Sequence, residues 1–258
     1  MLFEVENWTV EHPDLPGRLT SKSASFTVRA GEIVGFAGLM GAGRTELARS
    51  LFGRSYGIHR GGRLMLEGRE IAPKNVSQAI DAGLAYVTED RKVLGLNLLD
   101  TIKTTITSAN LKNIVKRGLL DMEKETEVAN GYRDDLRIKT PSVDVGVATL
   151  SGGNQQKVVL AKWMYTQPKV LILDEPTRGI DVGAKYEIYK LIQALADQGK
   201  AVIVISSELP EVLGICDRIY TICEGRITGC LAAGEADQET LMRRMTTTVG
   251  QPNEAIPA

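Results

Sequence analysis

The segment Leu150–Pro176, LSGGNQQKVVLAKWMYTQPKVLILDEP, decides the fold of this chain. It begins with a Gly-Gly turn and a helical run, Leu150–Gln156. It ends with a short apolar strand, Val170–Leu173, that leads into Asp174 and Glu175. Open α/β sheets bind ligands at the carboxyl ends of their strands. Adjacent strand residues point to opposite faces, so the pattern predicts that one carboxylate holds a metal ion while the other handles a water molecule.

A glycine-rich segment nearer the start has the spacing of a phosphate-binding loop. It follows an apolar strand expected at Ile33–Ala37, precedes a helix expected at Glu46–Phe52, and reads Gly38, Leu39, Met40, Gly41, Ala42, Gly43, Arg44, Thr45. The match to G-x-x-x-x-G-K-[ST] fails only at Arg44, which stands where lysine belongs. Glycines let backbone N–H groups surround phosphates at a helix N-terminus. A plain glycine turn is the alternative, but the position between strand and helix favours the phosphate loop.

The composition limits the class of protein. Of 258 residues, 43% are hydrophobic and 24% charged, as in soluble globular proteins. Thirty-one basic against 32 acidic residues give no electrostatic case for nucleic-acid binding. The apolar runs are too short to span a bilayer, and Glu4, Glu6 and Glu11 interrupt any signal peptide. We therefore expect a protein that stays in the cytosol.

The three cysteines, Cys216, Cys223 and Cys230, are spaced seven apart. Zinc sites need closer ligand pairs such as C-x₂-C. We therefore expect buried, reduced thiols in a hairpin of Arg218–Cys223 and Arg226–Leu231 rather than a metal site or a disulfide.

Further elements follow from periodicity and turn signals. Expected strands are Leu2–Val5, Ser25–Val28, Arg63–Glu67, Gly83–Thr88 and Ala201–Ile205. Residues 98–140 are expected to be mostly helical without sheet, and the other expected helices are Val76–Ala82, Val182–Asp197 and Gln238–Met245. In the helix over 182–197, Tyr186 and Tyr189 are interpreted as core packing. The end of the chain is expected to be a frayed polar tail.

The motifs at Leu150–Gln156 and Val170–Glu175 together resemble the signature motif and Walker B strand of ATP-binding-cassette (ABC) ATPases. The resemblance covers about residues 2–246. The segments GLMGAGRTEL, TEDRK, LSGGNQQK, DEPTRGIDVGAK and SSELPEVL are similar to the second cassette of fused double-cassette ATPases that energise bacterial importers of ribose, galactose or xylose. The chain would then be the C-terminal half of such a protein.

The resemblance implies an α/β, P-loop NTPase fold. Residues 1–258 would form one nucleotide-binding domain. Its RecA-like, mostly parallel sheet core would span 1–88 and 157–246, with an N-terminal antiparallel β subdomain. A helical subdomain, 89–156, would contain the signature motif, and 247–258 would form the tail.

In this family two cassettes sandwich two ATP molecules head to tail. The resemblance implies that Gly38–Thr45, with Glu46, cradles the phosphates. Thr45, Asp174 and Glu89 would hold Mg²⁺, while Glu175 and Ser207 would be catalytic. Two further sets would face the partner cassette: the signature residues Ser151, Gly152, Gly153, Asn154 and Gln155, and Asp181 of the D-loop, Thr177–Asp181.

Three positions depart from the family pattern. Arg44 replaces lysine, Glu89 a glutamine, and Ser207 a histidine. Because phosphoryl transfer relies on positioned positive charge and an oriented water, we expect nucleotide binding with slow hydrolysis. If Arg44 contacts the phosphates, its replacement by alanine should weaken binding by roughly 1.5–3 kcal/mol. No aromatic residue for adenine is obvious; Leu15 is nearest the expected place, after Trp8 and His12.

The resemblance also implies partners. These are a second ABC cassette, membrane permease subunits, and indirectly an extracytoplasmic sugar-binding protein, which would place the chain peripherally on the cytoplasmic side of the inner membrane. A regulatory nucleotide-binding module and a nucleoside importer ATPase are alternatives. A chromosome-maintenance or DNA-repair ABC ATPase is disfavoured, because the interval between Thr45 and Leu150 is too short for its coiled coil.

Overall fold

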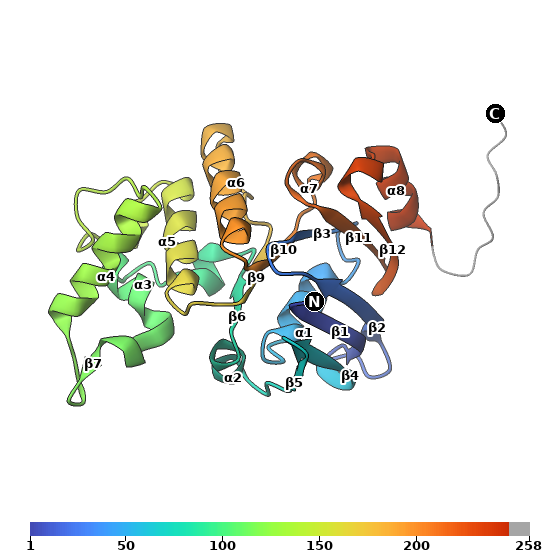
Figure 1. Cartoon of the computed structure of the whole chain (residues 1–258), viewed down its shortest axis with the longest axis horizontal. Helices are drawn as coiled ribbons and strands as arrows, with labels where there is room; N and C mark the ends of the chain where they lie inside the picture. The colour runs from blue at the N-terminus through green and yellow to red at the C-terminus, as the bar shows by residue number, and fades with distance from the viewer. Residues whose placement is uncertain (248–258) are drawn as a thin grey trace.

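A six-stranded sheet forms the centre of the computed structural model, which describes residues 1–247 (Figure 1). Its strand order is β12-β11-β3-β10-β9-β6. Only β12 runs antiparallel to its neighbour. The strands are β3 (Ile33–Gly38), β6 (Leu84–Val87), β9 (Val170–Asp174), β10 (Ala201–Ile205), β11 (Arg218–Cys223) and β12 (Arg226–Ala232). Every residue of β3, β6, β9 and β10 is buried, as expected of parallel strands covered on both faces.

A second, antiparallel sheet has the order β2-β1-β4-β5. Its strands are β1 (Phe3–Glu11), β2 (Leu19–Val28), β4 (Ile58–Leu66) and β5 (Arg69–Ile71). The strands β1, β2 and β4 are longer than the sequence predicts. Asn7 and Ser23 have φ values of 51° and 54°, and the register of β1 against β2 shifts beside Trp8. These bulges break the period-two alternation, which hides the outer halves of both strands from pattern analysis.

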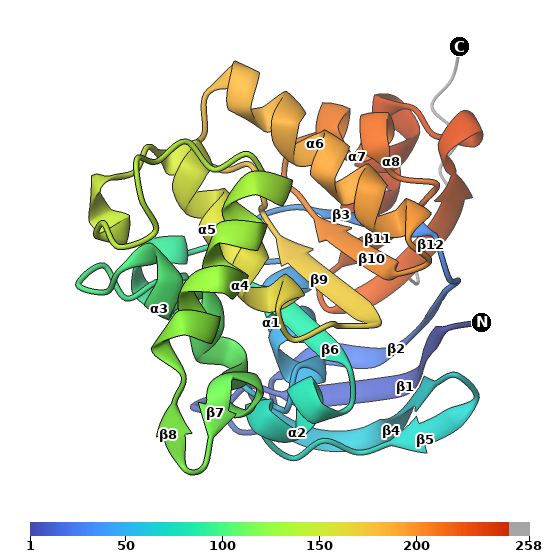
Figure 2. The same ribbon diagram turned by 60° about the vertical axis from the view of Figure 1, so that its left-hand side comes forward.

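Helices cover both faces of the central sheet (Figures 1 and 2). The helix α1 (Arg44–Leu51) packs between the two sheets, in contact with β2, β3 and β9. On the opposite face lie α6 (Val182–Asp197), α7 (Leu209–Ile215) and α8 (Gln238–Thr246). The short helix α2 (Val76–Asp81) contacts β6. The start of α1 is therefore held at the edge where β3, β9 and β10 end.

A helical region projects from the β6 side of the molecule (Figure 1). It contains α3 (Ile102–Thr107), α4 (Met122–Asp135) and α5 (Gly152–Met164), with short helical turns at Arg91–Gly95, Ser108–Ile114 and Val147–Thr149. The expectation that residues 98–140 contain no sheet was wrong: β7 (Val115–Lys116) and β8 (Leu119–Leu120) form a small hairpin. Two-residue strands are too short to show an alternation. The ring of Phe52, just after α1, packs edge-on against Trp163 of α5, with centroids 5.4 Å apart.

Two burial expectations need correction. Tyr186 of α6 is 61% exposed, and its ring faces the Lys190 ammonium instead of the core; the buried stripe of α6 is Ile188, Ile192 and Leu195. The hairpin of β11 and β12 forms as predicted. All three cysteines are free, but only Cys216 is fully buried, whereas Cys230 is exposed.

Within residues 1–247, no helix is both long and apolar enough to cross a membrane. The short helical turn Ala233–Glu235 leads from β12 to α8. Of the predicted tail, residues 248–258 lie outside the described part of the chain.

Candidate functional site

Three loops meet where the neighbouring strands β3, β10 and β9 end. The glycine-rich loop follows β3, Ser206 and Ser207 follow β10, and Glu175 follows β9. Because parallel strands all end at the same edge of their sheet, segments far apart in sequence converge there. The contacts described below confirm that this edge gathers Arg44, Thr45, Asp174, Glu175 and Ser207.

The glycine-rich loop is held from two sides. Gly43 caps the N-terminus of α1 with φ 100°, and a Cβ atom there would lie 2.6 Å from the carbonyl oxygen of Thr20. Both the conformation and the space therefore require glycine. The backbone N–H of Gly225, in the β11–β12 turn, donates to the carbonyl of Ala42 over 2.8 Å. The loop is thus preformed between β2 and the β11–β12 turn.

Arg44 runs inward from the start of α1. Its Nη1 donates to the carbonyl of Ser206 over 2.6 Å, and its Nη2 lies 3.7 Å from Glu175 Oε1. Burial lowers the pKa of the Arg44 guanidinium, and the charges of Glu175 and Asp174 oppose this effect. The positive charge of Arg44, which the sequence analysis assigned to the phosphates, therefore contacts protein groups in this structure.

Asp174 is fully buried at the end of β9. Its Oδ2 accepts a hydrogen bond of 2.8 Å from the Tyr86 hydroxyl, but within residues 1–247 no donor reaches Oδ1. Burial raises the pKa of Asp174, while the hydroxyls of Tyr86 and Thr45 lower it. A buried carboxylate oxygen without a partner is costly, and hard divalent cations prefer oxygen ligands. Asp174 and the neighbouring Thr45 hydroxyl therefore fit the predicted Mg²⁺.

Glu175 occupies a strained position directly after β9. Its φ of 49° lies in the left-handed region, and its backbone N–H donates to the carbonyl of Ile205 over 2.8 Å. Oε2 accepts from Ser207 Oγ at 3.2 Å. Burial raises the pKa of Glu175, and the charge of Arg44 and the hydroxyl of Ser207 oppose the rise. Strain of this kind concentrates at functional sites, and a carboxylate so placed could accept a proton from water.

A buried acid, Glu211, supports this edge and was missed by sequence reasoning. It accepts a hydrogen bond of 2.9 Å from Thr177 Oγ1 and a short one from Ser206 Oγ. Burial raises the pKa of Glu211, and these two hydroxyls lower it. Thr177 follows Glu175 closely and Ser206 contacts Arg44, so Glu211 links the two loops. The sequence carried no signal for this, because α7 is too short to show which face is buried.

Two other predicted site residues make protein contacts. The carboxylate of Glu89 pairs with the guanidinium of Arg178 in the D-loop, and its metal role stays a prediction. The carboxylate of Asp181 accepts a hydrogen bond of 2.9 Å from the backbone of Ala184 and so caps the N-terminus of α6.

The signature residues begin α5. Ser151 is its N-cap, and its Oγ accepts from Asn154 Nδ2 at 2.9 Å. The buried Gln155 donates to the carbonyl of Val147 over 3.4 Å. Ser151, Gly153 and Asn154 line a hollow of about 290 Å³ together with Asp181. This hollow shares no residue with the cavity beside the phosphate loop described next.

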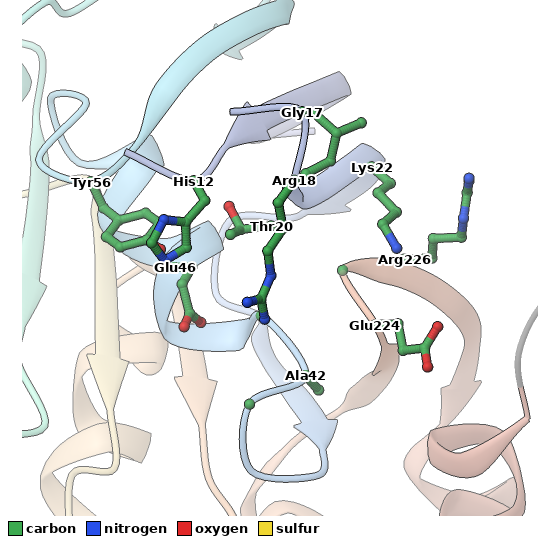
Figure 3. Close-up of a pocket in the computed structure, with 14 residues that line it drawn as sticks. His12, Gly17, Arg18, Thr20, Lys22, Ala42, Glu46, Tyr56, Glu224 and Arg226 are labelled. Atoms are coloured by element: carbon green, nitrogen blue, oxygen red, sulfur yellow. The ribbon is translucent and has the colours of Figure 1, made fainter. Parts of the chain in front are cut away.

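A cavity of about 660 Å³ opens beside the glycine-rich loop (Figure 3). The rings of His12 and Tyr56 pack edge to face on one wall, with centroids 6.2 Å apart. The Arg18 side chain, from the residue just before β2, reaches down toward the loop, and Glu46 also lines this cavity (Figure 3). Sequence reasoning missed Tyr56 and Arg18, because nothing in the chain indicates that the segments after β1 and after α1 meet.

Of the three residues considered for adenine, only His12 lines this cavity. Trp8 is buried, 3% exposed, and its indole N–H donates to Ser50 Oγ over 2.9 Å, so it is unavailable. Leu15 is exposed but does not line the cavity.

Comparison with protein families agrees with the geometry. The family model described as ABC transporter matches residues 21–178, more than half of the chain. The chain belongs to the ABC transporter family. The match includes both the phosphate loop and the signature and Walker B segments.

Curated ABC relatives named for sugar transport are similar over nearly all of the chain. The L-arabinose transport ATP-binding protein AraG of Geobacillus stearothermophilus is 56% identical over 97% of this chain and 49% of the relative. The xylose import ATP-binding protein XylG of Thermoanaerobacter pseudethanolicus is 51% identical over 94% and 48%. The ribose import ATP-binding protein RbsA of Bacillus subtilis is 48% identical over 95% and 48%. The chain spans about half the length of these relatives.

Solved structures show the same fold. An ATP-binding cassette of an ABC transporter superposes with a TM-score of 0.78, at 19% identity, over 94% of this chain and 98% of the other. A dimeric cassette bound to ADP and phosphate gives a TM-score of 0.74, at 18% identity, over 90% and 99%. The predicted α/β ABC cassette fold is confirmed.

Proposed function

We propose that this chain binds Mg·ATP and works as one cassette of a two-cassette ATPase that energises sugar import. The observation that carries the proposal is made at Asp174, whose buried Oδ1 has no hydrogen-bond partner within residues 1–247 and lies at the edge where the phosphate loop and Glu175 meet. The buried carboxylates of Glu125 and Glu211 accept hydrogen bonds from hydroxyl groups, whereas Oδ1 of Asp174 has no such donor within residues 1–247. The names of the arabinose, xylose and ribose relatives support the sugar as cargo.

The nucleotide would lie along the cavity of Figure 3. The phosphates would occupy the Gly38–Thr45 loop, where backbone amides and the N-terminus of α1 favour an anion. The adenine base would lie beside His12 and Tyr56. Arg18 would contact the sugar of the nucleotide and its first phosphate. Thr45 and Asp174 would hold Mg²⁺, which neutralises the charge that develops on the phosphates.

Hydrolysis at this chain's own site would be slow. Glu175 can polarise a water, but it already contacts Arg44 and Ser207. Serine cannot supply the positive charge of the histidine that it replaces. Losing one positioned donor typically costs on the order of 10²–10³ in rate. The Arg44–Glu175 contact also favours a second candidate function, a regulatory nucleotide-binding module with little hydrolysis of its own.

The signature residues would serve the ATP of a second cassette, in the other half of a full-length protein. Ser151 and the amides of Gly152 and Gly153 stand at the N-terminus of α5, which favours an anion. The assembly would bind permease subunits at the cytoplasmic side of the membrane and receive sugar from a binding protein outside. The permease and the binding protein would select the sugar.

The test uses the full double-cassette protein. Ser151→Arg places a bulky cation in the signature site and should abolish steady-state ATPase activity, whereas Ser207→Ala should reduce it little. Ser77→Arg, at an exposed position of α2, is the matched control for the added charge. The opposite result would be retained turnover in Ser151→Arg and lost turnover in Ser207→Ala. It would mean that this chain's own site, despite its three departures from the family pattern, hydrolyses the ATP, and it would overturn the proposal.

A further inference from the structure

The segment that follows β6 and the D-loop, Thr177–Asp181, contact each other through two sets of interactions. The carboxylate of Glu89 pairs with the side chain of Arg178. In return, the guanidinium of Arg91 donates to two successive D-loop carbonyls, from Nη1 to Arg178 over 2.8 Å and from Nη2 to Gly179 over 3.3 Å. The rigid, planar fork of arginine suits such a pair of acceptors.

The start of the signature helix lies against the same guanidinium. A Cβ atom on Gly152 would be 2.9 Å from Arg91 Nη2 and 3.2 Å from the carbonyl oxygen of Gly179. A Cβ atom on Gly153 would be 2.7 Å from Ala184 in the first turn of α6. Arg91 therefore lies beside both the start of the signature helix and the D-loop.

Both ends of this arrangement are anchored. The Asp90 side chain accepts from the backbone N–H groups of Lys92 and Val93, each over 3.1 Å, and fixes the turn that carries Arg91. At the other end, the backbone N–H of Arg178 donates to the carbonyl of Glu175 over 3.1 Å. A displacement of the Arg91 turn would therefore reach the D-loop directly.

We propose that Arg91 is a positioning residue that holds the D-loop and the signature helix in one arrangement for the partner cassette. The assignment of the partner rests on the proposed function. Ser151 and Asp181, which belong to these two segments, line the same hollow. Arg91 thus sets the geometry of the site that this chain offers to the partner's ATP, and it adds a positive charge beside that anion site. The proposed positioning role does not concern the phosphate loop of this chain.

We call this holding of the D-loop and the signature helix by Arg91 the clamp. Hydrogen exchange on this chain alone, without the partner cassette, tests it. We compare Arg91→Ala and Arg91→Lys with Lys92→Ala, a neighbouring exposed cation as control. In Arg91→Ala, amides of 151–155 and of 177–184 should both exchange about tenfold faster, as expected when hydrogen bonds to a charged group are lost. Strands β9 and β10 should be unchanged, and Arg91→Lys should lie between. Faster exchange in only one segment, or in neither, overturns the clamp.

The second measurement is the ATPase of the full double-cassette protein. Arg91→Ala should lower kcat between about tenfold and 100-fold, as small misplacements of a site do, with KM within about twofold. Arg91→Lys should restore part of kcat. A kcat equal to that of Lys92→Ala overturns the positioning role. If instead exchange shows the clamp but the Ser151→Arg protein keeps full turnover, the proposed function fails and the clamp stands.

Discussion

Arg44 is the residue at which the phosphate loop departs from its consensus, and its contacts change the expected effect of replacing it. Both guanidinium contacts go to protein groups, Ser206 and Glu175. We therefore predict that Arg44→Ala raises the Kd for Mg·ATP by less than about tenfold, or about 1.4 kcal/mol. It should also lower the melting temperature, because Glu175 loses its countercharge.

Titration calorimetry and thermal unfolding check this prediction, with Arg44→Lys as the matched variant that keeps the charge. An affinity loss in the range of roughly 1.5–3 kcal/mol would show that the guanidinium turns to the phosphates when nucleotide binds.

The buried carboxylate of Glu211 gives a second prediction at the residue scale. Thr177→Val removes one of its two hydroxyl donors and should lower the free energy of unfolding by about 1–3 kcal/mol. Thr149→Val, at an exposed position, should change it by no more than about 0.5 kcal/mol. Urea titrations measure both, and equal effects would contradict the role given to Glu211.

Among the elements, β3 and β11 are joined by an ion pair at their starts. Arg218 contacts Glu32 through Nε and Nη2, over 2.6 and 3.2 Å, and the backbone N–H of Arg29 also donates to Glu32. Burial raises the pKa of Glu32, but the hydrogen bonds from Arg218 and Arg29 outweigh it, so the pKa lies below its usual value.

A lowered pKa fixes the sign of the pH dependence. The stability from ionised Glu32 is present above the unfolded-state pKa of about 4.3 and is lost as pH falls through the folded-state value. Glu32→Gln should cost about 1–3 kcal/mol at pH 7, and its difference from the native chain should shrink below about pH 4. Urea unfolding from pH 3 to 7 measures this; a constant difference would contradict it.

The elements also show what a sequence can predict. The strands β9 and β10 and the helix α6 were predicted with nearly correct bounds, because uninterrupted apolar runs and regular periods are direct signs of burial. In β1 the bulge at Asn7 breaks the period, and β7 and β8 are too short to have one. Of the site, the loops with fixed spacing were predictable. Tyr86, Glu211 and Tyr56 were not, because their roles arise only when distant segments meet.

For the molecule as a whole, we predict that this chain alone is mostly monomeric in Mg·ATP. Its site carries three departures from the family pattern, whereas its signature residues are intact, so a stable sandwich requires a different cassette. Sedimentation velocity with and without Mg·ATP measures this. A tight ATP-dependent homodimer would contradict it.

The packing around α1 allows intrinsic tryptophan fluorescence to report on the phosphate loop. The chain has two tryptophans. The indole of Trp8 donates to Ser50 within α1, and Trp163 packs on Phe52 at its end. Because α1 begins at the loop and both contacts are at its other end, a shift of this helix changes the surroundings of both indoles. Intrinsic fluorescence, with Trp8→Phe and Trp163→Phe to separate the two signals, can therefore follow the helix in the unlabelled chain.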